Sequence, residues 1–472
     1  MSANGKIIRN LLLTLAGLGL VALFLFWVEG TGSRRMNDAV ALFAILGIAA
    51  VSLNLINGVT GILSLGHHGF MLIGGYTTAL LVLPEAARER ILDSARSQMT
   101  PTTLGLSMSN WLSALGLDVL TTPETMWVRF LLSLLVGGFV AMLFGLIVGI
   151  PSLRLRGDYL AIVTFGFGEI IRLLAATSLL ASFTNGALGF AGVPSVLFGK
   201  NIWFVFPLLA ATVFVLLKLK YSSYGRALQG IREDEVAAQA MGVNTAYHKV
   251  LAFAISAFFA GVAGGLYVSW LGTARLESFL FVITFFLLVA ISVGGTGSFT
   301  GVLLGTALVI FVRQYGDPLE EAYPLTTWLT LAGGALVLAA LGTLLLRHIQ
   351  RLRPRFNRGI AVLGGLGLLA IVFALLAPSF GLLEGSWRGF GMRAILLSIL
   401  LIVIMIFRPS GIMGSSEFNW AALFGERRDK PSDEERAQDA WLTNPALNKD
   451  KTAALSDKNA PTRPPRSGDR EV

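Results

Sequence analysis

Glu169 and Arg172 stand together inside an apolar run that covers residues 158–180. Glu169 lies ~16 Å from the start of the run if the run is an α-helix. Because side chains three residues apart share a helix face, the carboxylate and the guanidinium can form an ion pair. Ionisable groups at membrane depth are costly and usually face the interior of a helix bundle. Two interpretations stay open: a role beside a solute path, shared with Thr164, and a structural ion pair that fixes helix packing.

Glycines and polar residues interrupt two further apolar stretches, residues 53–76 and 292–301. Glycine costs roughly 1 kcal/mol relative to alanine inside a helix, so this density argues against plain helices. Non-helical backbone at membrane depth persists where it lines a cavity or is buried in protein. One interpretation is broken helices that line a path, and the other is tight packing of helices through small residues. The path interpretation includes Asn54, Asn57, Gly61, Ser64 and Tyr76 from the first stretch and Gly294, Gly295, Gly297 and Ser298 from the second.

A charged island, defined as Tyr221 to Lys249, separates two long apolar stretches. Its centre has three acids followed by small residues, and negative charge is favoured near the start of a helix. Ser222 or Ser223 can begin a helical segment here, and Gly242 can end it. Such a segment suits contact with a soluble partner, and a solvated connecting helix is the alternative. The residues that we expect to contact the partner are Glu233, Asp234, Glu235, Ala237, Ala238 and Gly242.

The sequence contains no phosphate-binding loop of the form G-x-x-x-x-G-K-[ST]. The pair Gly199-Lys200 is followed by Asn201, and the stretch 292–301 has no lysine. We therefore expect that the chain is not an enzyme, needs no cofactor, and depends on a partner for any use of ATP. A metal site at His67 and His68 is not favoured.

The composition is that of a membrane protein. The chain has 472 residues and a mean hydropathy of +0.70, and only 14% of its residues are charged. Soluble domains carry about 25% charged residues. The absence of cysteine excludes disulfides. The net charge of +9 comes from short loops between apolar runs, which indicates membrane orientation rather than a nucleic-acid partner.

The apolar runs predict an all-α fold, a polytopic transmembrane helix bundle with about 12 spans, or 10–12. We expect it to include broken or re-entrant Gly-rich helices and a cytoplasmic coupling helix. The spans 69–83 and 299–313 are short and flanked by glycine, so they are the candidates for broken or re-entrant helices. The expected spans are 11–28, 38–57, 69–83, 128–150, 158–180, 201–218, 249–271, 278–293, 299–313, 326–346, 359–377 and 391–407.

Lys and Arg gather in the loops 151–157, 219–248 and 347–358, so we expect these loops and both termini in the cytoplasm. The last of these loops lies between two extra spans. From residue 425 onward, charges, proline and serine replace apolar periodicity, which predicts a disordered tail. The expected division is a permease core at 1–313 that includes the coupling loop 219–248, a two-span insertion at 314–390, a last helix at 391–414 and the tail at 425–472.

Several segments together resemble a known family. Residues 236–242 are similar to the EAA-x-x-x-G cytoplasmic loop of ABC importer permeases, with Val236 in place of the glutamate and Glu235 one residue early. The other matching segments are RLRGDYLAIVTFGFGEIIR, GRALQGIREDEVAAQAMGV, GGTGSFTG and FRPSGIMG. Over residues 38–313 and 391–414 the chain resembles the permease subunits of branched-chain amino acid ABC transporters, of the LivM type.

The resemblance implies a permease subunit in a bacterial inner membrane. Its partners would be a second related permease, two cytoplasmic ABC ATPase subunits and a periplasmic solute-binding protein that delivers leucine, isoleucine or valine. The ATPases would drive alternating access, with the segment around Ala237, Ala238 and Gly242 seated in a cleft of one of them. The insertion 314–390 and the tail are additions to shorter relatives, so the helix count stays open.

Other functions remain as alternatives. A secondary transporter of the major-facilitator kind also has about twelve spans, but the basic signature usual after its second span is missing at Ser64–His68. An intramembrane enzyme that uses Ser64 and His67 has no evident third group to orient the histidine. Within the ABC family, urea, amides and other small organic solutes are alternative substrates.

Overall fold

The computed structural model describes most of residues 19–315 and several short segments beyond them. The described residues are 19–30, 33–94, 99–100, 106–116, 123–152, 157–194, 201–315, 322–324, 386–388, 411–414 and 416–417, with Gly17, Thr103, Ser398, Leu401, Ile402 and Ile406. All of them beyond Gly17 belong to one compact unit that ends at Glu417. The expected spans 326–346 and 359–377, the loop 347–358 and the tail 425–472 lie outside these residues, as does most of the span 391–407.

The described part is mainly helical, which confirms the all-α class. Its longer helices are α2 (Arg34–Asn54), α3 (His67–Val82), α7 (Met126–Ser152), α8 (Asp158–Ala176), α10 (Ile202–Tyr221), α13 (Thr245–Leu271), α14 (Phe281–Gly294) and α15 (Phe299–Tyr315). Its shorter helices are α4 (Glu85–Leu92), α6 (Met108–Ala114), α9 (Ala181–Thr184), α11 (Ser223–Glu233) and α12 (Glu235–Ala240). Single turns are η1 (Leu55–Val59), η3 (Pro123–Thr125), η4 (Gly186–Leu188) and η5 (Leu276–Phe279).

Two short antiparallel strand pairs join segments that are distant in the sequence. Strand β1 (Phe190–Ala191) pairs with β2 (Thr273–Ala274), and β3 (Ala322–Pro324) pairs with β4 (Ser386–Arg388). Phe190 lies opposite Ala274, and Tyr323 lies opposite Trp387. The first pair fixes the loop after α9 to the end of α13.

Six helices among the described residues are long and apolar enough to cross a membrane, or seven if a bent pair is one span. The bent pair joins α3 to α4 with an angle of 103°. Shorter apolar helices cover Gly19–Gly30 and Phe299–Tyr315. A multi-pass bundle is therefore confirmed in this part of the chain, whereas the expected count of about 12 spans is not.

Small residues let the central helices approach closely. A Cβ atom built on Gly74 of α3 would overlap the backbone of Gly261 in α13, and one built on Gly264 would overlap the carbonyl of Met71. Close backbone approach of this kind is a main source of helix association in membranes, where no hydrophobic effect acts between helices. The core of the bundle is accordingly built by α2, α3, α7 and α13.

The glycine-dense stretch 53–76 divides into two parts. After α2 the chain forms the π-helical turn η1 and then has no regular structure until Gly66. The later glycines, from Gly69 onward, lie inside the continuous helix α3 and serve its packing. The helix break therefore lies in the first half of the stretch, and packing through small residues lies in the second.

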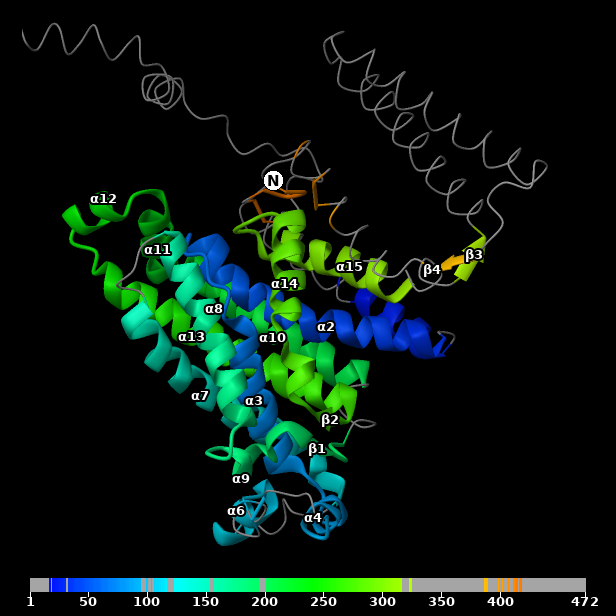
Figure 1. Ribbon diagram of the computed structural model, residues 1–472. Coiled ribbons are helices and arrows are strands. Elements are labelled where there is room, and N and C mark those ends of the chain that lie inside the picture. The colour runs from blue at the N-terminus through cyan, green and yellow to red at the C-terminus, as the bar shows by residue number, and fades with distance from the viewer. Residues whose placement is uncertain are drawn as a thin grey trace, which may run out of the picture. The chain divides into compact units, whose positions relative to one another are not determined.

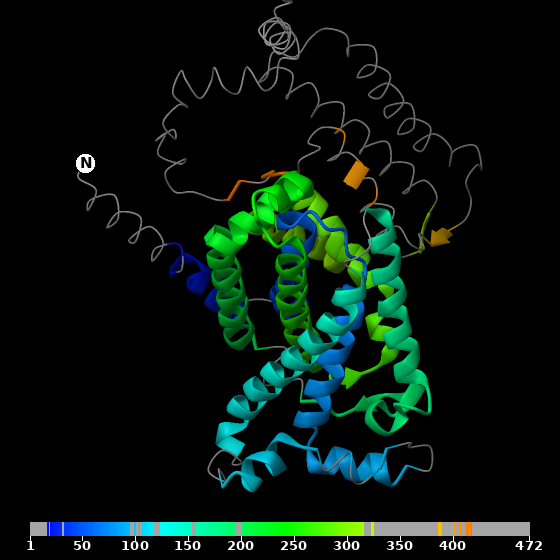
Figure 2. The same ribbon diagram turned by 90° about the vertical axis from the view of Figure 1, so that its left-hand side faces the viewer.

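The charged island forms one end of the described unit. Figure 1 shows α11 and α12 at one end of the long helices and α4 and α6 at the opposite end. The view in Figure 2 shows the same separation, with the long helices running between the two ends. This arrangement suits a bundle whose two ends face opposite sides of a membrane.

Candidate functional site

The charged island folds as two short helices joined by an acidic residue. Ser222 caps the start of α11 by accepting a hydrogen bond from the amide of Gly225. Asp234 is extended between the helices, and its carboxylate accepts from the amides of Val236 and Ala237 at 2.8 and 3.0 Å. This is the standard N-cap arrangement, so Asp234 determines where α12 begins.

Two polar contacts fasten α12 to the start of α13. The ammonium of Lys249 lies 2.6 Å from the Glu235 carboxylate, and the Gln239 amide donates to the Thr245 hydroxyl at 2.8 Å. The small side chain of Ala238 is buried beneath the helix. One face of α12 is therefore occupied by the chain itself.

The opposite face of α12 is open and apolar. Val236 is 66% exposed and Met241 is 83% exposed. Gly242 ends the segment with φ +84°, a left-handed conformation that favours glycine, and Glu233 is exposed at the end of α11. Of the residues expected to meet a partner, Ala237, Gly242, Glu233 and Asp234 are exposed. Asp234 also caps α12, Glu235 is half-buried in its ion pair, and Ala238 is buried.

The first glycine-broken segment, defined as residues 55–66, is held by one asparagine side chain and one threonine side chain. Asn57 accepts from the amide of Ser64 at 3.0 Å and thereby closes the loop on itself. Thr164 of α8 accepts from the amide of Leu65 at 3.1 Å. Amide and hydroxyl side chains thus replace hydrogen bonds that the broken helix cannot make.

The second glycine-broken segment, residues 294–298, joins α14 to α15. Gly295 and Gly297 adopt φ values of +123° and +95°, which only glycine takes readily. A Cβ on Gly294 would overlap the carbonyl of Gly301, so the two helices meet without side chains between them. The Asn54 side chain accepts from the amide of Gly297 at 3.0 Å, which connects the second broken segment to the end of α2, directly before the first.

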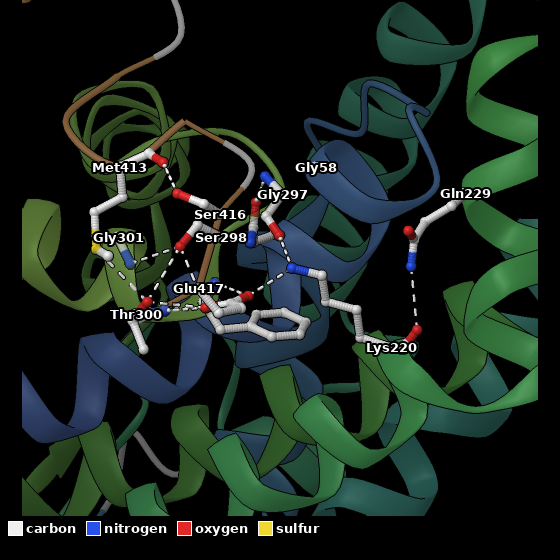
Figure 3. A network of polar contacts seen from close by, with 12 residues as sticks. Gly58, Lys220, Gln229, Gly297, Ser298, Thr300, Gly301, Met413, Ser416 and Glu417 are labelled. Carbon is white, nitrogen blue, oxygen red and sulfur yellow. Dashed lines mark hydrogen bonds and ion pairs between the residues drawn. The ribbon is translucent and has the colours of Figure 1, made fainter. Parts of the chain in front are cut away.

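Two cations, one directly before the island and one inside it, bind carbonyl groups in these segments. Lys220, in the last turn of α10, donates to the carbonyl of Gly297 at 2.8 Å. Arg232, near the end of α11, donates to the carbonyl of Gly58. Figure 3 shows Lys220 directed between Gly297 and Glu417, with Gly58 nearby. Helix breaks leave carbonyls without partners, and these cations supply the donors.

Glu417 completes this network from a segment that follows the last expected span. Its carboxylate lies 2.6 Å from the Lys220 ammonium and accepts from the amides of Phe299 and Thr300 at 2.9 and 3.0 Å. The carboxylate therefore caps the N-terminus of α15, where negative charge is favoured. Figure 3 shows this cap together with the additional bond from the Thr300 hydroxyl.

The environment of Glu417 keeps it ionised. Burial alone raises the pKa of this carboxyl, but the hydrogen bonds from Lys220, Thr300 and Phe299 outweigh burial and lower the pKa below its ordinary value. The ionised Glu417 therefore stabilises the folded chain fully at a pH above the pKa that this carboxyl has in the unfolded chain. The stabilisation is lost as the pH falls through the lower pKa of the folded chain.

A separate polar cluster lies between α3, α8 and α14. The Arg172 guanidinium pairs with the Glu169 carboxylate at 2.8 Å, as the sequence predicts, and His68 lies 3.5 Å from the other carboxylate oxygen. His68 also contacts the Thr284 hydroxyl at 3.2 Å. Glu169 and Arg172 remain 23% and 22% exposed, while His68 is buried. The cluster can hold a charged or zwitterionic group on its open side.

Two buried hydroxyls have no hydrogen-bond partner among the described residues. They belong to Ser64, just before α3, and Tyr76, further along α3, where its ring meets Phe190 edge to face at 5.4 Å. An unpaired buried polar group costs roughly 1–3 kcal/mol, so a polar solute that paired with it would gain. No group of three or more His, Asp or Glu side chains within the described residues is arranged to hold a metal ion.

The twelve residues expected along the path thus separate into four places. Asn54, the three glycines of the second segment and Ser298 lie at the carbonyl network. Asn57, Gly61, Ser64 and Thr164 lie at the first broken segment. Glu169 and Arg172 form the ion pair beside His68, and Tyr76 lies apart on α3. Sequence reasoning missed Lys220, Arg232 and Glu417 as members of a site. A usable signal existed for Lys220, at the end of an apolar run, and for Glu417, after a glycine-containing segment, whereas Arg232 lies inside the charged island.

Comparison with known proteins gives consistent matches. The family described as "Branched-chain amino acid transport system / permease component" matches residues 36–341. The chain is 31% identical over 342 residues to the high-affinity branched-chain amino acid transport system permease protein LivM of Escherichia coli (strain K12), covering 66% of this chain and 69% of that protein. The LivM protein of Salmonella typhimurium (strain LT2) matches to the same extent.

A more distant relative comes from an archaeon. It is the probable branched-chain amino acid transport permease protein LivM of Methanocaldococcus jannaschii, 25% identical over 292 residues, with 58% of this chain and 79% of that protein covered. No solved structure matches the chain.

Proposed function

The chain belongs to the family of branched-chain amino acid transport permeases, and from this we propose that it is the membrane-spanning subunit of an ATP-binding cassette importer. It translocates branched-chain, hydrophobic amino acids across a bacterial inner membrane by alternating access. Two cytoplasmic ATPases drive it, a second related permease pairs with it, and a periplasmic binding protein delivers the solute.

One observation carries the link to an ATPase: α12 is fastened on one face and open on the other. The Glu235–Lys249 pair and the buried Ala238 hold its base, while Val236 and Met241 project outward. An exposed apolar patch on a polar loop is a typical protein-docking surface. Because the base is rigid, force applied to the exposed side reaches α11 and α13 rather than being lost in a flexible loop.

The polar cluster and the unpaired hydroxyls support a solute path along α3. Helix α8 carries Glu169 and Arg172. Only 28% of the residues in its most apolar stretch are buried inside the protein, against 89% for the span that begins with α2. A partly exposed ion pair on a peripheral span is costly against lipid, so water or a second protein must cover it. A path between this chain and a related permease provides such cover.

Reconstitution tests the function. The full chain, purified together with the proposed ATPases, second permease and binding protein, is placed in proteoliposomes, and uptake of labelled leucine is measured. We expect uptake that requires ATP and binding protein and that vanadate abolishes. Uptake by the chain alone that ignores vanadate would instead assign a secondary transporter. Competition by valine or isoleucine, but not urea, would place the substrate among branched-chain amino acids.

A further inference from the structure

Two cations connect the charged island to both glycine-broken segments. Lys220 immediately precedes the island, and Arg232 lies near the end of its first helix, so the two cations bracket α11. Each binds a backbone carbonyl on a different segment, Gly297 for Lys220 and Gly58 for Arg232. A displacement of α11 therefore acts on both segments.

The fit of Arg232 requires glycine at its contacts. A Cβ on Gly61 would lie 2.7 Å from Cγ of Arg232, and one on Gly297 would lie 2.9 Å from its Nη1. The arginine thus lies against both broken segments where neither has a side chain. Positions 61 and 297 therefore require glycine for two reasons: a side chain would overlap Arg232, and both residues have positive φ values.

The two segments also contact each other and α15. A Cβ on Gly58 would overlap the amide nitrogen of Gly297. The Asn54–Gly297 bond joins the second segment to the end of α2, and Glu417 holds both the Lys220 ammonium and the first amides of α15. Lys220 and Glu417 are buried, so their pairing is little screened by water or salt. The network is therefore a continuous set of contacts from α11 to the start of α15.

We propose that Lys220 and Arg232 are positioning residues that transmit movement of the charged island to the two glycine-broken segments through the carbonyls of Gly297 and Gly58. The inference rests on the proposed function, because it assumes that the island is moved by an ATPase. Glu417 keeps Lys220 directed at Gly297. Broken segments can change backbone conformation at small cost, which suits them to open and close a path.

The first test compares transport with ATP hydrolysis in the reconstituted complete transporter. Arg232→Gln keeps a polar side chain but removes the charge and the reach to Gly58. We expect about tenfold less leucine carried per ATP hydrolysed, a usual size for coupling between sites, with hydrolysis retained. Lys220→Met should act in the same direction. The matched control is Arg226→Gln, because Arg226 is an exposed cation on the same helix that bonds only locally, to the Tyr221 carbonyl.

A charge swap separates the carbonyl contacts from a simple ion pair. In Lys220→Glu with Glu417→Lys the opposite charges remain, but Glu at 220 cannot donate to Gly297 and Lys at 417 cannot accept from Phe299 and Thr300. We expect uptake per ATP to stay low in the swapped chain. Recovery to the wild-type level would overturn the role of the Gly297 carbonyl.

Hydrogen exchange of the full chain in detergent tests the network without any partner. Arg232→Gln should speed amide exchange in residues 55–66 and in 294–298 together, whereas Arg226→Gln should not. Wild-type exchange and wild-type uptake per ATP in Arg232→Gln would overturn the proposal. Absence of ATP-dependent uptake in the wild-type transporter would overturn the proposed function instead, and the exchange result would still decide whether Arg232 holds both segments.

Discussion

The three acids at the centre of the charged island have different roles. Asp234 caps α12, Glu235 pairs with Lys249, and Glu233 is exposed. The Glu235–Lys249 pair is largely buried, with 28% of the Glu235 side chain and 10% of the Lys249 side chain exposed. An N-cap is typically worth ~1 kcal/mol. Loss of Asp234 is therefore expected to disturb the helix itself, and Glu233 is the acid best placed to meet a partner.

A substitution at Glu169 distinguishes a role beside the solute path from a structural role in helix packing. Glu169→Gln removes the charge but keeps the size, so Arg172 loses its counter-ion and His68 loses the neighbouring carboxylate. If the pair borders the path, leucine uptake should fall about tenfold, equivalent to roughly 1.4 kcal/mol, while the amount of chain in the membrane changes little. Quantitative immunoblots of membranes give the second measurement. An equal loss of uptake and abundance would identify a structural ion pair.

At the scale of elements, α12 shows why docking must be tested on its open face. Ala238 is buried and Gly242 has φ +84°, so bulky substitutions at either position strain this chain whether or not a partner exists. A non-glycine residue in the left-handed region costs roughly 1–2 kcal/mol. Exposed positions avoid this ambiguity.

Met241→Asp is the resulting prediction. The side chain is 83% exposed, so the free energy of unfolding should change by no more than about 0.5 kcal/mol. A charge placed in an apolar docking surface should reduce ATP-driven uptake more than about tenfold, the size of an interface hot spot. Uptake assays and co-purification of the ATPases provide the measurement. Met241→Leu is the control and should behave as wild type; normal uptake in Met241→Asp would remove α12 from the docking surface.

At the scale of the whole molecule, the charged island and the α4–α6 region lie at opposite ends of the described helices (Figure 1). The charge bias of the loops predicts that the island faces the cytoplasm. An odd or even number of spans would tell whether the two termini face the same side of the membrane. The six or seven spans among the described residues do not give this number, because further expected spans lie outside these residues. The orientation therefore needs its own test.

Introduced cysteines provide that test, because the natural chain has none. Met241→Cys and Leu115→Cys place single thiols at two highly exposed positions, in the island and after α6. A membrane-impermeant maleimide should label position 115 in intact cells, after removal of the outer membrane, and position 241 only in inside-out vesicles. Labelling of both positions from the same side would contradict a bundle whose two ends face opposite sides.

The sequence by itself determined the class of the molecule. Apolar runs, charge bias and the EAA-like island predict a helical permease, because these signals are local and each is read within one segment. The Glu169–Arg172 pair was equally local, since both residues lie on one helix.

The tertiary structure alone decided which distant groups meet. The contacts of Lys220 with Gly297 and Glu417, and of Arg232 with Gly58, join residues far apart in the chain. Their spacing in the sequence carries no periodicity that predicts contact. Backbone carbonyls become available for such contacts only where a helix ends or breaks. The side chain that reaches each carbonyl is then decided by how the broken segments pack against the bundle.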